Sequence, residues 1–274
     1  SILDALDADG RLRSNFNLQG TTSGRLSSSG NINYQNLPRD KGPGTIKSAF
    51  KAREGYVIVQ ADLKTAEVYV AAVLSDDKFL QQAFIDKVDF HSYIAKQIFN
   101  LDCEVEEVGD KYPDHRQWAK AITFGIMYQA GAATISETAK VTKAEAQDFI
   151  NKYFNEAVQL KNFIEKCNNQ IEACQFIYSA FGRKRRLMEA LSPSRGVKYH
   201  AIRSGVNFVV QSMASDINLL VLCDVMEWID ETKQHDTMIP FTIVHDSIVA
   251  EVRIDRVRDF INKIDEFVRI DRGI

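Results

Sequence analysis

Residues 241–252 read FTIVHDSIVAEV, two runs of apolar and β-branched residues separated by a polar His-Asp-Ser. Runs of this composition favour β-strands, and the polar residues between them mark a tight turn. The stretch therefore predicts a β-hairpin with Asp246 at its turn. A second β-rich run, residues 56–61 (YVIVQA), ends directly before Asp62.

The two aspartates, Asp62 and Asp246, each stand at the end of a predicted strand. Neighbouring strands of one sheet would bring their carboxylates together at one edge. Carboxylates at such a point can hold a pair of hard divalent cations for phosphoryl displacement, and Mg²⁺ suits oxygen ligands of this kind. The alternative is two ordinary turn aspartates.

Helical periodicity dominates the middle of the chain, between the two strand regions. The predicted helices cover residues 65–74, 78–100, 114–129, 132–140, 143–173, 198–232 and 255–269. Thr142 and Glu145 have the spacing of a capping box. Residues 17–45 are predicted to be a polar connecting region, and residues 182–186 (GRKRR) a basic loop. Strand-rich ends around a helical middle indicate an α+β sheet domain with a helical insertion.

A stripe of four side chains marks the predicted helix 114–129. Arg116, Lys120, Phe124 and Tyr128 are spaced four apart and therefore share one helix face. Cations can neutralise a triphosphate while a ring covers the base of the same nucleotide. The alternative is a solvated basic end and a buried aromatic end.

A local basic segment stands out against the composition of the whole chain. The 274 residues hold 34 Lys and Arg against 37 Asp and Glu, a net charge of −3, which gives no global attraction to nucleic acid. Residues 182–203 hold seven cations and one acid, so their net charge of +6 can bind a phosphate backbone. A nuclear-localisation run or an exposed loop has the same composition.

Cysteine and histidine spacing excludes several classes of site. The four cysteines form no C-x-x-C pair and the five histidines no H-E-x-x-H pair, so a zinc site is not expected. Unpaired thiols favour a reducing compartment, the host cytoplasm if the protein is viral. No run of about eighteen apolar residues predicts a membrane span. The chain opens without Met and is expected to be a piece of a longer protein.

Seven short motifs together resemble the DNA polymerase I family (family A DNA polymerases). Residues 62–67 (DLKTAE), 116–128 (RQWAKAITFGIMY) and 244–247 (VHDS) match its motifs A, B and C in order and separation. Residues 22–28 (TSGRLSS), 33–38 (NYQNLP), 89–92 (DFHS) and 182–185 (GRKR) match further elements of the family. The match covers nearly the whole chain, and the lean motifs favour a phage or other viral member.

The resemblance implies a role for each matching residue. Asp62 and Asp246 would bind metal, and Arg116 and Lys120 would grip the incoming triphosphate, with Lys120 assisting the leaving pyrophosphate. Glu67 would be the steric gate against a 2′-hydroxyl. The other expected nucleotide contacts are Phe124, Tyr128 and His91. The expected primer–template contacts are Arg25, Gln35, Asn36, Arg183, Gln211 and His245.

Three positions depart from the family pattern. Residues 63–66 (LKTA) replace a Tyr-Ser-Gln-Ile that includes the tyrosine expected to hold the gate glutamate. Ser247 replaces the glutamate that commonly ends motif C, and chemistry is expected to survive without it. Gln129 replaces a glycine after motif B and is expected to stiffen that end of the helix.

The resemblance implies a right-hand polymerase fold without thumb and exonuclease domains. Residues 1–76 would form the first part of an antiparallel-sheet palm, residues 77–200 a mainly helical fingers insertion, and residues 201–274 the second part of the palm. The implied cofactor is Mg²⁺ (two ions). The implied partners are primer–template DNA and dNTPs, with no membrane and with any replication accessory factor unknown. The alternatives are a single-subunit RNA polymerase, which Glu67 disfavours, and an inactive nucleic-acid-binding fragment.

Overall fold

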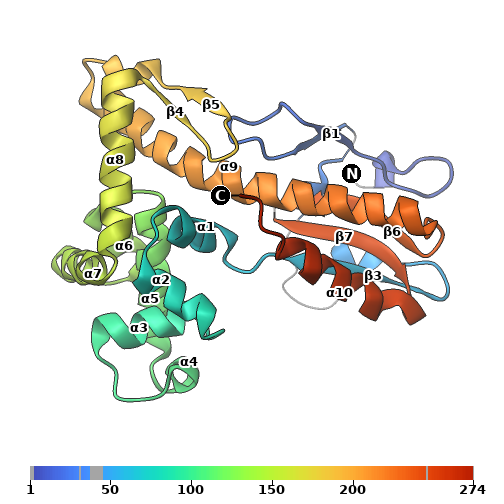
Figure 1. Ribbon diagram of the computed structural model, residues 1–274, viewed down its shortest axis with the longest axis horizontal. Coiled ribbons are helices and arrows are strands. Elements are labelled where there is room, and N and C mark those ends of the chain that lie inside the picture. The colour runs from blue at the N-terminus through green and yellow to red at the C-terminus, as the bar shows by residue number, and fades with distance from the viewer. Residues whose placement is uncertain (1–2, 31, 38–45, 245, 274) are drawn as a thin grey trace. The chain divides into compact units, whose positions relative to one another are not determined.

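The computed structural model describes residues 3–30, 32–37, 46–244 and 246–273, and the chain divides into two compact units (Figure 1). We call residues 1–64 with 211–274 the sheet unit and residues 65–210 the helical unit. These limits differ from the predicted limits at 76/77 and 200/201. Helix α1 (Ala66–Leu74) groups with the other helices, and the long helix α9 (Arg195–Thr232) has residues in both units.

The sheet unit is built on three antiparallel strands in the order β3-β7-β6. Strand β3 (Tyr56–Asp62) pairs along its whole length with β7 (Ser247–Arg253), which pairs on its other side with β6 (Met238–Val244). The predicted hairpin and the predicted strand are therefore confirmed, and they are neighbours in one sheet.

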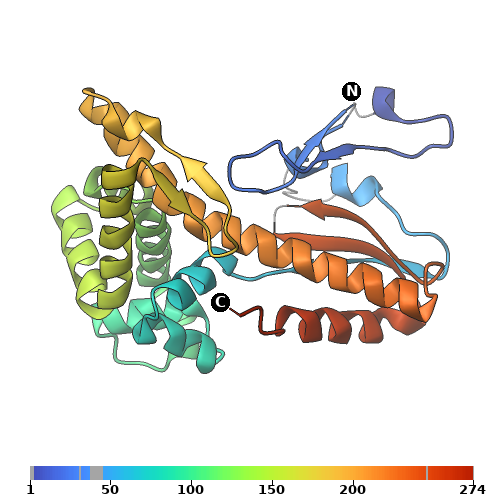
Figure 2. The same cartoon turned by 45° about the horizontal axis from the view of Figure 1, so that its top comes forward.

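One face of this sheet packs on two helices. Ile248, Ala250 and Val252 alternate along β7, so their side chains share a face, and all are at most 2% exposed. They cluster with Val221, Val225 and Ile229 of α9 and with Phe260 and Ile264 of α10 (Val257–Val268). Figure 2 shows α10 and the C-terminal part of α9 running beside the strands. This packing fixes the sheet edge at which Asp62 and Asp246 lie.

The N-terminal part of the sheet unit is an irregular segment with short elements. These are η1 (Leu3–Ala5), β1 (Asn15–Asn17), β2 (Ser27–Ser29), η2 (Tyr34–Asn36) and η3 (Ile46–Ala49), and η6 (Ile254–Arg256) precedes α10. The predicted connecting region 17–45 thus contains β2 and η2.

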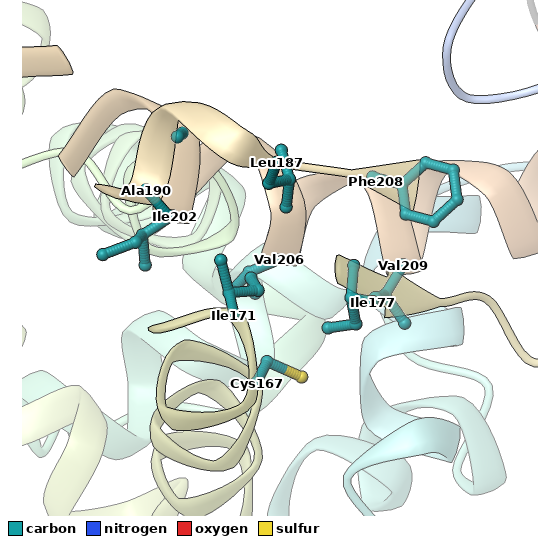
Figure 3. Close-up of a cluster of buried hydrophobic side chains, with 10 residues drawn as sticks. Cys167, Ile171, Ile177, Leu187, Ala190, Ile202, Val206, Phe208 and Val209 are labelled. Carbon is teal, nitrogen blue, oxygen red and sulfur yellow. The ribbon is translucent and has the colours of Figure 1, made fainter. Parts of the chain in front are cut away.

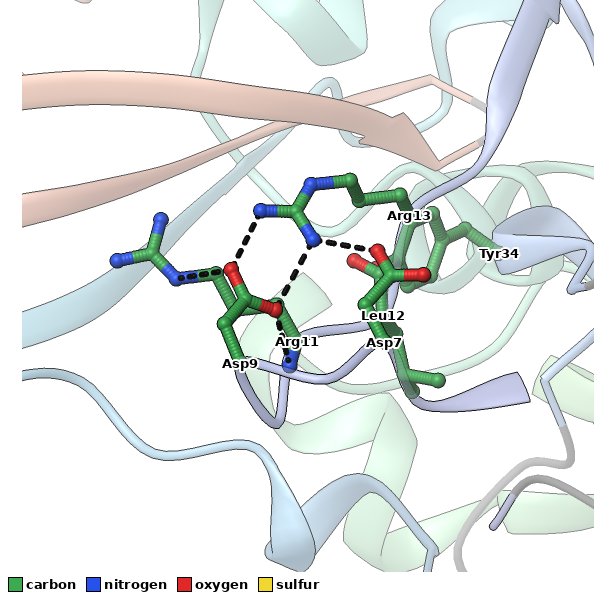
Figure 4. A network of polar contacts seen from close by, with 6 residues as sticks. All are labelled: Asp7, Asp9, Arg11, Leu12, Arg13 and Tyr34. Carbon is green, nitrogen blue, oxygen red and sulfur yellow. Dashed lines mark hydrogen bonds and ion pairs between the residues drawn. The ribbon is translucent and has the colours of Figure 1, made fainter. Parts of the chain in front are cut away.

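Arg13 pairs with Asp7 and Asp9 at the surface (Figure 4). Hydrogen bonds from Arg13 lower the pKa of Asp9 to about 2.

The helical unit contains more helix breaks than the sequence predicts. Its other helices are α2 (Lys78–Ile85), α3 (Phe90–Phe99), α4 (Val108–Lys111), α5 (Pro113–Met127), α6 (Ala132–Ala139), α7 (Lys143–Glu156) and α8 (Val158–Cys174), with η4 at Val105–Glu107. The prediction of one helix over 78–100 is wrong. Lys87 takes a left-handed φ of 57°, and Asp89 is the N-cap of a new helix, α3, where its side chain accepts from the Ser92 amide.

The prediction of one helix over 143–173 is also wrong. The chain breaks at Ala157, which has φ −88° and ψ 60°. The amide of Leu160 at the start of α8 then donates to the buried carboxylate of Asp77, over 2.9 Å, and Asp77 also caps α2. The predicted capping box of Thr142 and Glu145 is confirmed at the start of α7.

A short β-hairpin occupies part of the predicted basic loop, which is a correction to that prediction. Strand β4 (Phe176–Tyr178) pairs with β5 (Lys184–Arg186), and η5 (Met188–Leu191) follows. Figure 3 shows the cluster that anchors this region: Ile177 and Leu187 meet Ile171 of α8 and Val206 and Phe208 of α9.

By its length and composition alone, helix α9 is long and apolar enough to cross a membrane. Of its most apolar 18-residue window, 56% is buried inside the protein. Burial of this extent is typical of a core helix, and a core helix can be as long and as apolar as a membrane helix.

Candidate active site

The two predicted metal-binding aspartates lie at the same end of the sheet. Asp62 is the last residue of β3 and is paired in register with Ser247, the first residue of β7. Asp246 directly precedes Ser247, and its carbonyl accepts a hydrogen bond from the Leu63 amide over 3.2 Å. The antiparallel register therefore brings together two residues that are far apart in the chain.

A third charged group, Arg25, reaches the same end of the sheet. Its Nη2 atom lies 3.2 Å from Asp246 Oδ1 and 3.4 Å from Oδ2. The hydroxyl of Thr21 donates to the Arg25 carbonyl over 2.7 Å, which ties the loop that carries Arg25. The ion pair is partly exposed, with 27% of the Arg25 side chain and 24% of the Asp246 side chain accessible.

The donor chemistry at this end of the sheet fits Mg²⁺. Magnesium takes one or two protein carboxylates and completes its octahedron with waters and substrate phosphates. Asp62 and Asp246 supply two hard oxygen ligands. Among the residues that the structure describes, no group of three or more His, Cys, Asp and Glu could form an all-protein metal cage.

Ser247, which stands in place of the family's motif C glutamate, has a structural position. It is fully buried, its hydroxyl donates to the Val244 carbonyl over 2.8 Å, and it accepts from Gln60 Nε2 over 2.9 Å. The serine therefore closes the hairpin turn beside Asp246.

The helical unit holds the predicted gate residue. Glu67 lies in the first turn of α1, is 7% exposed, and accepts a hydrogen bond from the Tyr128 hydroxyl over 3.0 Å. Tyr128 is the C-cap of α5, and the next residue, Gln129, takes a left-handed φ of 49°, a conformation that glycine adopts without the Cβ penalty. Tyr128 thus contacts the gate glutamate although motif A lacks its usual tyrosine.

The predicted stripe on α5 lines a cavity of about 290 Å³. Lys120, Phe124 and Tyr128 form one side, and Thr134 and Thr138 of α6 form part of the other. The two helices approach closely at Gly125, where an added Cβ would lie 2.5 Å from the Ile135 side chain. His91 of α3, which is 5% exposed, packs on the Phe124 ring with centroids 5.7 Å apart.

The fourth residue of the stripe, Arg116, is held by Asp89. Arg116 Nε lies 2.9 Å from Asp89 Oδ1 and Nη2 lies 3.1 Å from Oδ2, a bidentate pair. Burial disfavours the charged Asp89, but hydrogen bonds from Arg116 and Ser92 outweigh it and hold the pKa of Asp89 well below its usual range. The sequence prediction missed Asp89 as a contact of Arg116. No local signal marks this contact, because Asp89 in the DFHS motif has the pattern of the N-cap of α3.

The remaining predicted DNA contacts are dispersed. In the sheet unit, Gln35 donates from its side chain to the Leu26 carbonyl over 2.9 Å, Asn36 is exposed, and Gln211 is partly buried on α9. Arg183 lies in the exposed turn between β4 and β5 of the helical unit. His245 lies outside the described residues.

Comparisons with known proteins agree on one family. The model of DNA polymerase family A matches residues 2–271. The chain is 44% identical to the DNA polymerase of Escherichia phage T5 over 100% of this chain, and 31% identical to DNA polymerase I of Caldicellulosiruptor bescii over 96% of it. Among solved structures, the POL domain of Pol1 from M. smegmatis, in complex with DNA primer-template and dNTP, has a TM-score of 0.87 at 28% identity.

The chain spans about a third of the curated relatives it matches, 34% of the phage protein and 30% of the C. bescii protein. The match to the M. smegmatis structure includes 97% of this chain and 46% of the M. smegmatis chain. Its fold confirms the predicted α+β class.

Proposed function

Because the chain belongs to DNA polymerase family A, we propose that it carries out template-directed DNA synthesis, adding deoxynucleotides to a primer 3′ end during DNA replication. The observation that carries the proposal is the juxtaposition of Asp62 and Asp246 at one end of the sheet. The names of the relatives, all DNA polymerases, support it.

Asp62 and Asp246 would hold two Mg²⁺ ions, which when bound lower the pKa of the primer 3′-hydroxyl and offset charge on the leaving pyrophosphate. Arg25 pairs with Asp246 and holds its carboxylate in place when no cation is bound. Binding of a cation at Asp246 would release Arg25 to contact the primer terminus, the role that its motif implies.

The α5 stripe would bind the incoming nucleotide. Lys120 supplies a mobile ammonium for the triphosphate and can donate a proton to the departing pyrophosphate. Arg116, which Asp89 holds through two hydrogen bonds, presents a fixed guanidinium to the same phosphates. Phe124, supported by His91, offers a ring to the sugar and base, and Tyr128 helps check the nascent pair.

Glu67 would exclude ribonucleotides. Its carboxylate is buried and fixed by Tyr128, so a 2′-hydroxyl would meet a group that cannot move aside. The primer–template is expected to contact Arg25, Gln35, Asn36, Arg183, Gln211 and His245. The location that we propose is the cytoplasm, which is the host cytoplasm if the protein is viral.

Extension of a labelled primer on a DNA template tests the proposal, with dNTPs and NTPs supplied in separate reactions. In the presence of Mg²⁺, the expected result is extension with dNTPs and no extension with NTPs. Extension with NTPs at a similar rate would instead identify an RNA polymerase. Tight primer–template binding without extension by either set would identify a nucleic-acid-binding fragment.

A further inference from the structure

The outward face of the β4–β5 hairpin alternates rings and cations. In this antiparallel pair, Phe176 is opposite Arg186 and Tyr178 is opposite Lys184. Because side chains alternate along a strand, these four share one face. The Lys184 ammonium lies 3.8 Å from the centre of the Phe176 ring, while Tyr178 is 47% exposed.

The opposite face of the hairpin is anchored in the core of the helical unit. Ile177 is 2% exposed within the cluster of α8 and α9. Its partner Arg185 donates to the Ser204 carbonyl of α9 over 2.9 Å and lies 5.6 Å from the centre of the Phe208 ring. The hairpin is therefore a fixed platform whose other face is directed outward.

The turn adds a further ring and cation in a defined conformation. The Arg183 carbonyl accepts from the Ser179 amide over 2.9 Å, and the Ser179 hydroxyl accepts from the Arg183 amide over 3.1 Å. Gly182 takes φ +80°, which other residues adopt only with strain. Phe181 beside it is 36% exposed.

The hairpin itself carries only positive charge. Residues 183–186 are four consecutive cations, and no acidic residue occurs between Glu172 and Glu189. The Lys184 ammonium also lies 5.4 Å from the centre of the Tyr178 ring, which stays 47% exposed. An exposed ring beside clustered cations is a combination by which proteins bind single strands, since bases stack on the rings and cations pair with the phosphates.

We propose that the outward face of the hairpin, comprising Phe176, Tyr178, Lys184 and Arg186 with Phe181 and Arg183 at its turn, binds single-stranded DNA. The inference rests on the proposed function, because a polymerase meets such a strand either as the unpaired template overhang or as a strand displaced from the template. Stacking on Tyr178 requires unpaired bases, so duplex DNA is not the ligand of this face.

Fluorescence anisotropy of the 274-residue chain tests this with three DNAs of equal duplex length. One is a blunt duplex, one has a 5′ template overhang of about ten nucleotides, and one has a 5′ flap on a displaced strand with no template overhang. The variants are Tyr178→Ala, Tyr178→Phe and Lys184→Ala. Lys161→Ala, which removes an exposed cation from α8 in the same unit, is the matched control.

Tyr178→Ala is expected to weaken binding about tenfold to the DNA that carries the recognised strand, with no change for the blunt duplex. Tyr178→Phe keeps the ring and retains the affinity. Lys184→Ala reduces the slope of log affinity against log salt by about 0.7, as loss of one single-strand phosphate contact does, and Lys161→Ala leaves it unchanged.

The two unpaired substrates identify the source of the strand. If Tyr178→Ala loses affinity only for the DNA with the template overhang, the hairpin binds the template strand. If it loses affinity only for the DNA with the flap, the hairpin binds the displaced strand. An unchanged affinity of Tyr178→Ala for both, or an equal loss for the blunt duplex, overturns the proposal.

Primer extension by the unsubstituted chain, measured in parallel, separates the two proposals. A chain that extends primers but shows no dependence on Tyr178 refutes the single-strand platform alone. A chain that binds unpaired DNA through Tyr178 without extending primers refutes the polymerase function alone.

Discussion

The Tyr128 hydroxyl at the end of α5 donates to Glu67 Oε2 in α1 over 3.0 Å. The two residues are 61 positions apart, and the bond fixes a carboxylate that is 7% exposed. In this chain, Tyr128 of motif B therefore restrains Glu67, the proposed gate residue of motif A.

Tyr128→Phe is expected to weaken selection against ribonucleotides. The substitution keeps the ring and removes a hydrogen bond to a charged group, which is worth about 1.5–3 kcal/mol when buried and less here because Tyr128 is partly exposed. The ratio of kcat/KM for dNTP over NTP should fall by about tenfold. Tyr69→Phe, on the same helix as Glu67, is the control, and an unchanged ratio in Tyr128→Phe contradicts the assignment.

The bidentate pair of Asp89 and Arg116 gives a second prediction, for nucleotide binding. Asn caps a helix as well as Asp does, so Asp89→Asn preserves the start of α3, while it removes the charge opposite Arg116 and one of the two oxygens that accept from Arg116. KM for dNTP should rise by about tenfold, with a smaller change in kcat, because Arg116 loses its fixed orientation. Asp86→Asn, an exposed acid nearby, should leave KM unchanged; equal effects of both variants would count against a positioning role.

The same pair predicts a pH dependence of stability. Since the folded-state pKa of Asp89 is depressed, its stabilising contribution is present above the unfolded pKa of about 4 and is lost as pH falls toward the folded pKa. Denaturant unfolding should show a constant difference between wild type and Asp89→Asn from about pH 8 to 5, and a shrinking difference below about pH 4. A difference that grows on acidification would be inconsistent with this sign.

Arg25 predicts competition with the cation at Asp246. Arg25→Met should tighten Mn²⁺ binding by up to about fivefold in the absence of DNA, measured by electron paramagnetic resonance, since a partly exposed ion pair is worth at most about 1 kcal/mol. Primer binding should weaken at the same time. Arg53→Met removes an ion pair with Glu251 elsewhere on β7 and serves as the control. If both variants bind Mn²⁺ like the wild type, Arg25 does not compete.

Phe124 predicts selectivity against dideoxynucleotides. Its ring carries no hydroxyl that could substitute for the missing 3′-hydroxyl of the nucleotide. Phe124→Tyr should raise dideoxynucleotide incorporation by about tenfold or more while dNTP incorporation, the internal control, changes little. Unchanged incorporation would show that the ring does not face the sugar.

Local pattern was sufficient to predict the sheet and the closeness of Asp62 and Asp246. The runs at 56–61 and 241–252 have the alternation and turn chemistry of strands, and an antiparallel register then places Asp62 near Asp246. The four-residue spacing of Arg116, Lys120, Phe124 and Tyr128 predicted one shared face. Lys120, Phe124 and Tyr128 line a common cavity, whereas Arg116 pairs with Asp89.

The features that the sequence did not reveal depend on tertiary contacts. The break at Ala157 is stabilised by Asp77, 80 positions earlier, and no local signal marks it. Strand β5 was predicted as part of a basic loop because residues 183–186 are four consecutive cations with no apolar alternation. The Asp89–Arg116 pair joins two helices whose packing the sequence pattern does not specify.

The most direct test of the central proposal is single-turnover primer extension by Asp62→Asn and Asp246→Asn. Each variant keeps the size of the side chain and replaces a charged carboxylate by a neutral amide with a single acceptor oxygen. Asp259→Asn, an exposed acid on α10 paired with Arg256, is the control. Loss of the extension rate by about a thousandfold or more in both variants, with a normal rate in the control, is the predicted result. Extension near the wild-type rate by either Asp62→Asn or Asp246→Asn would contradict it.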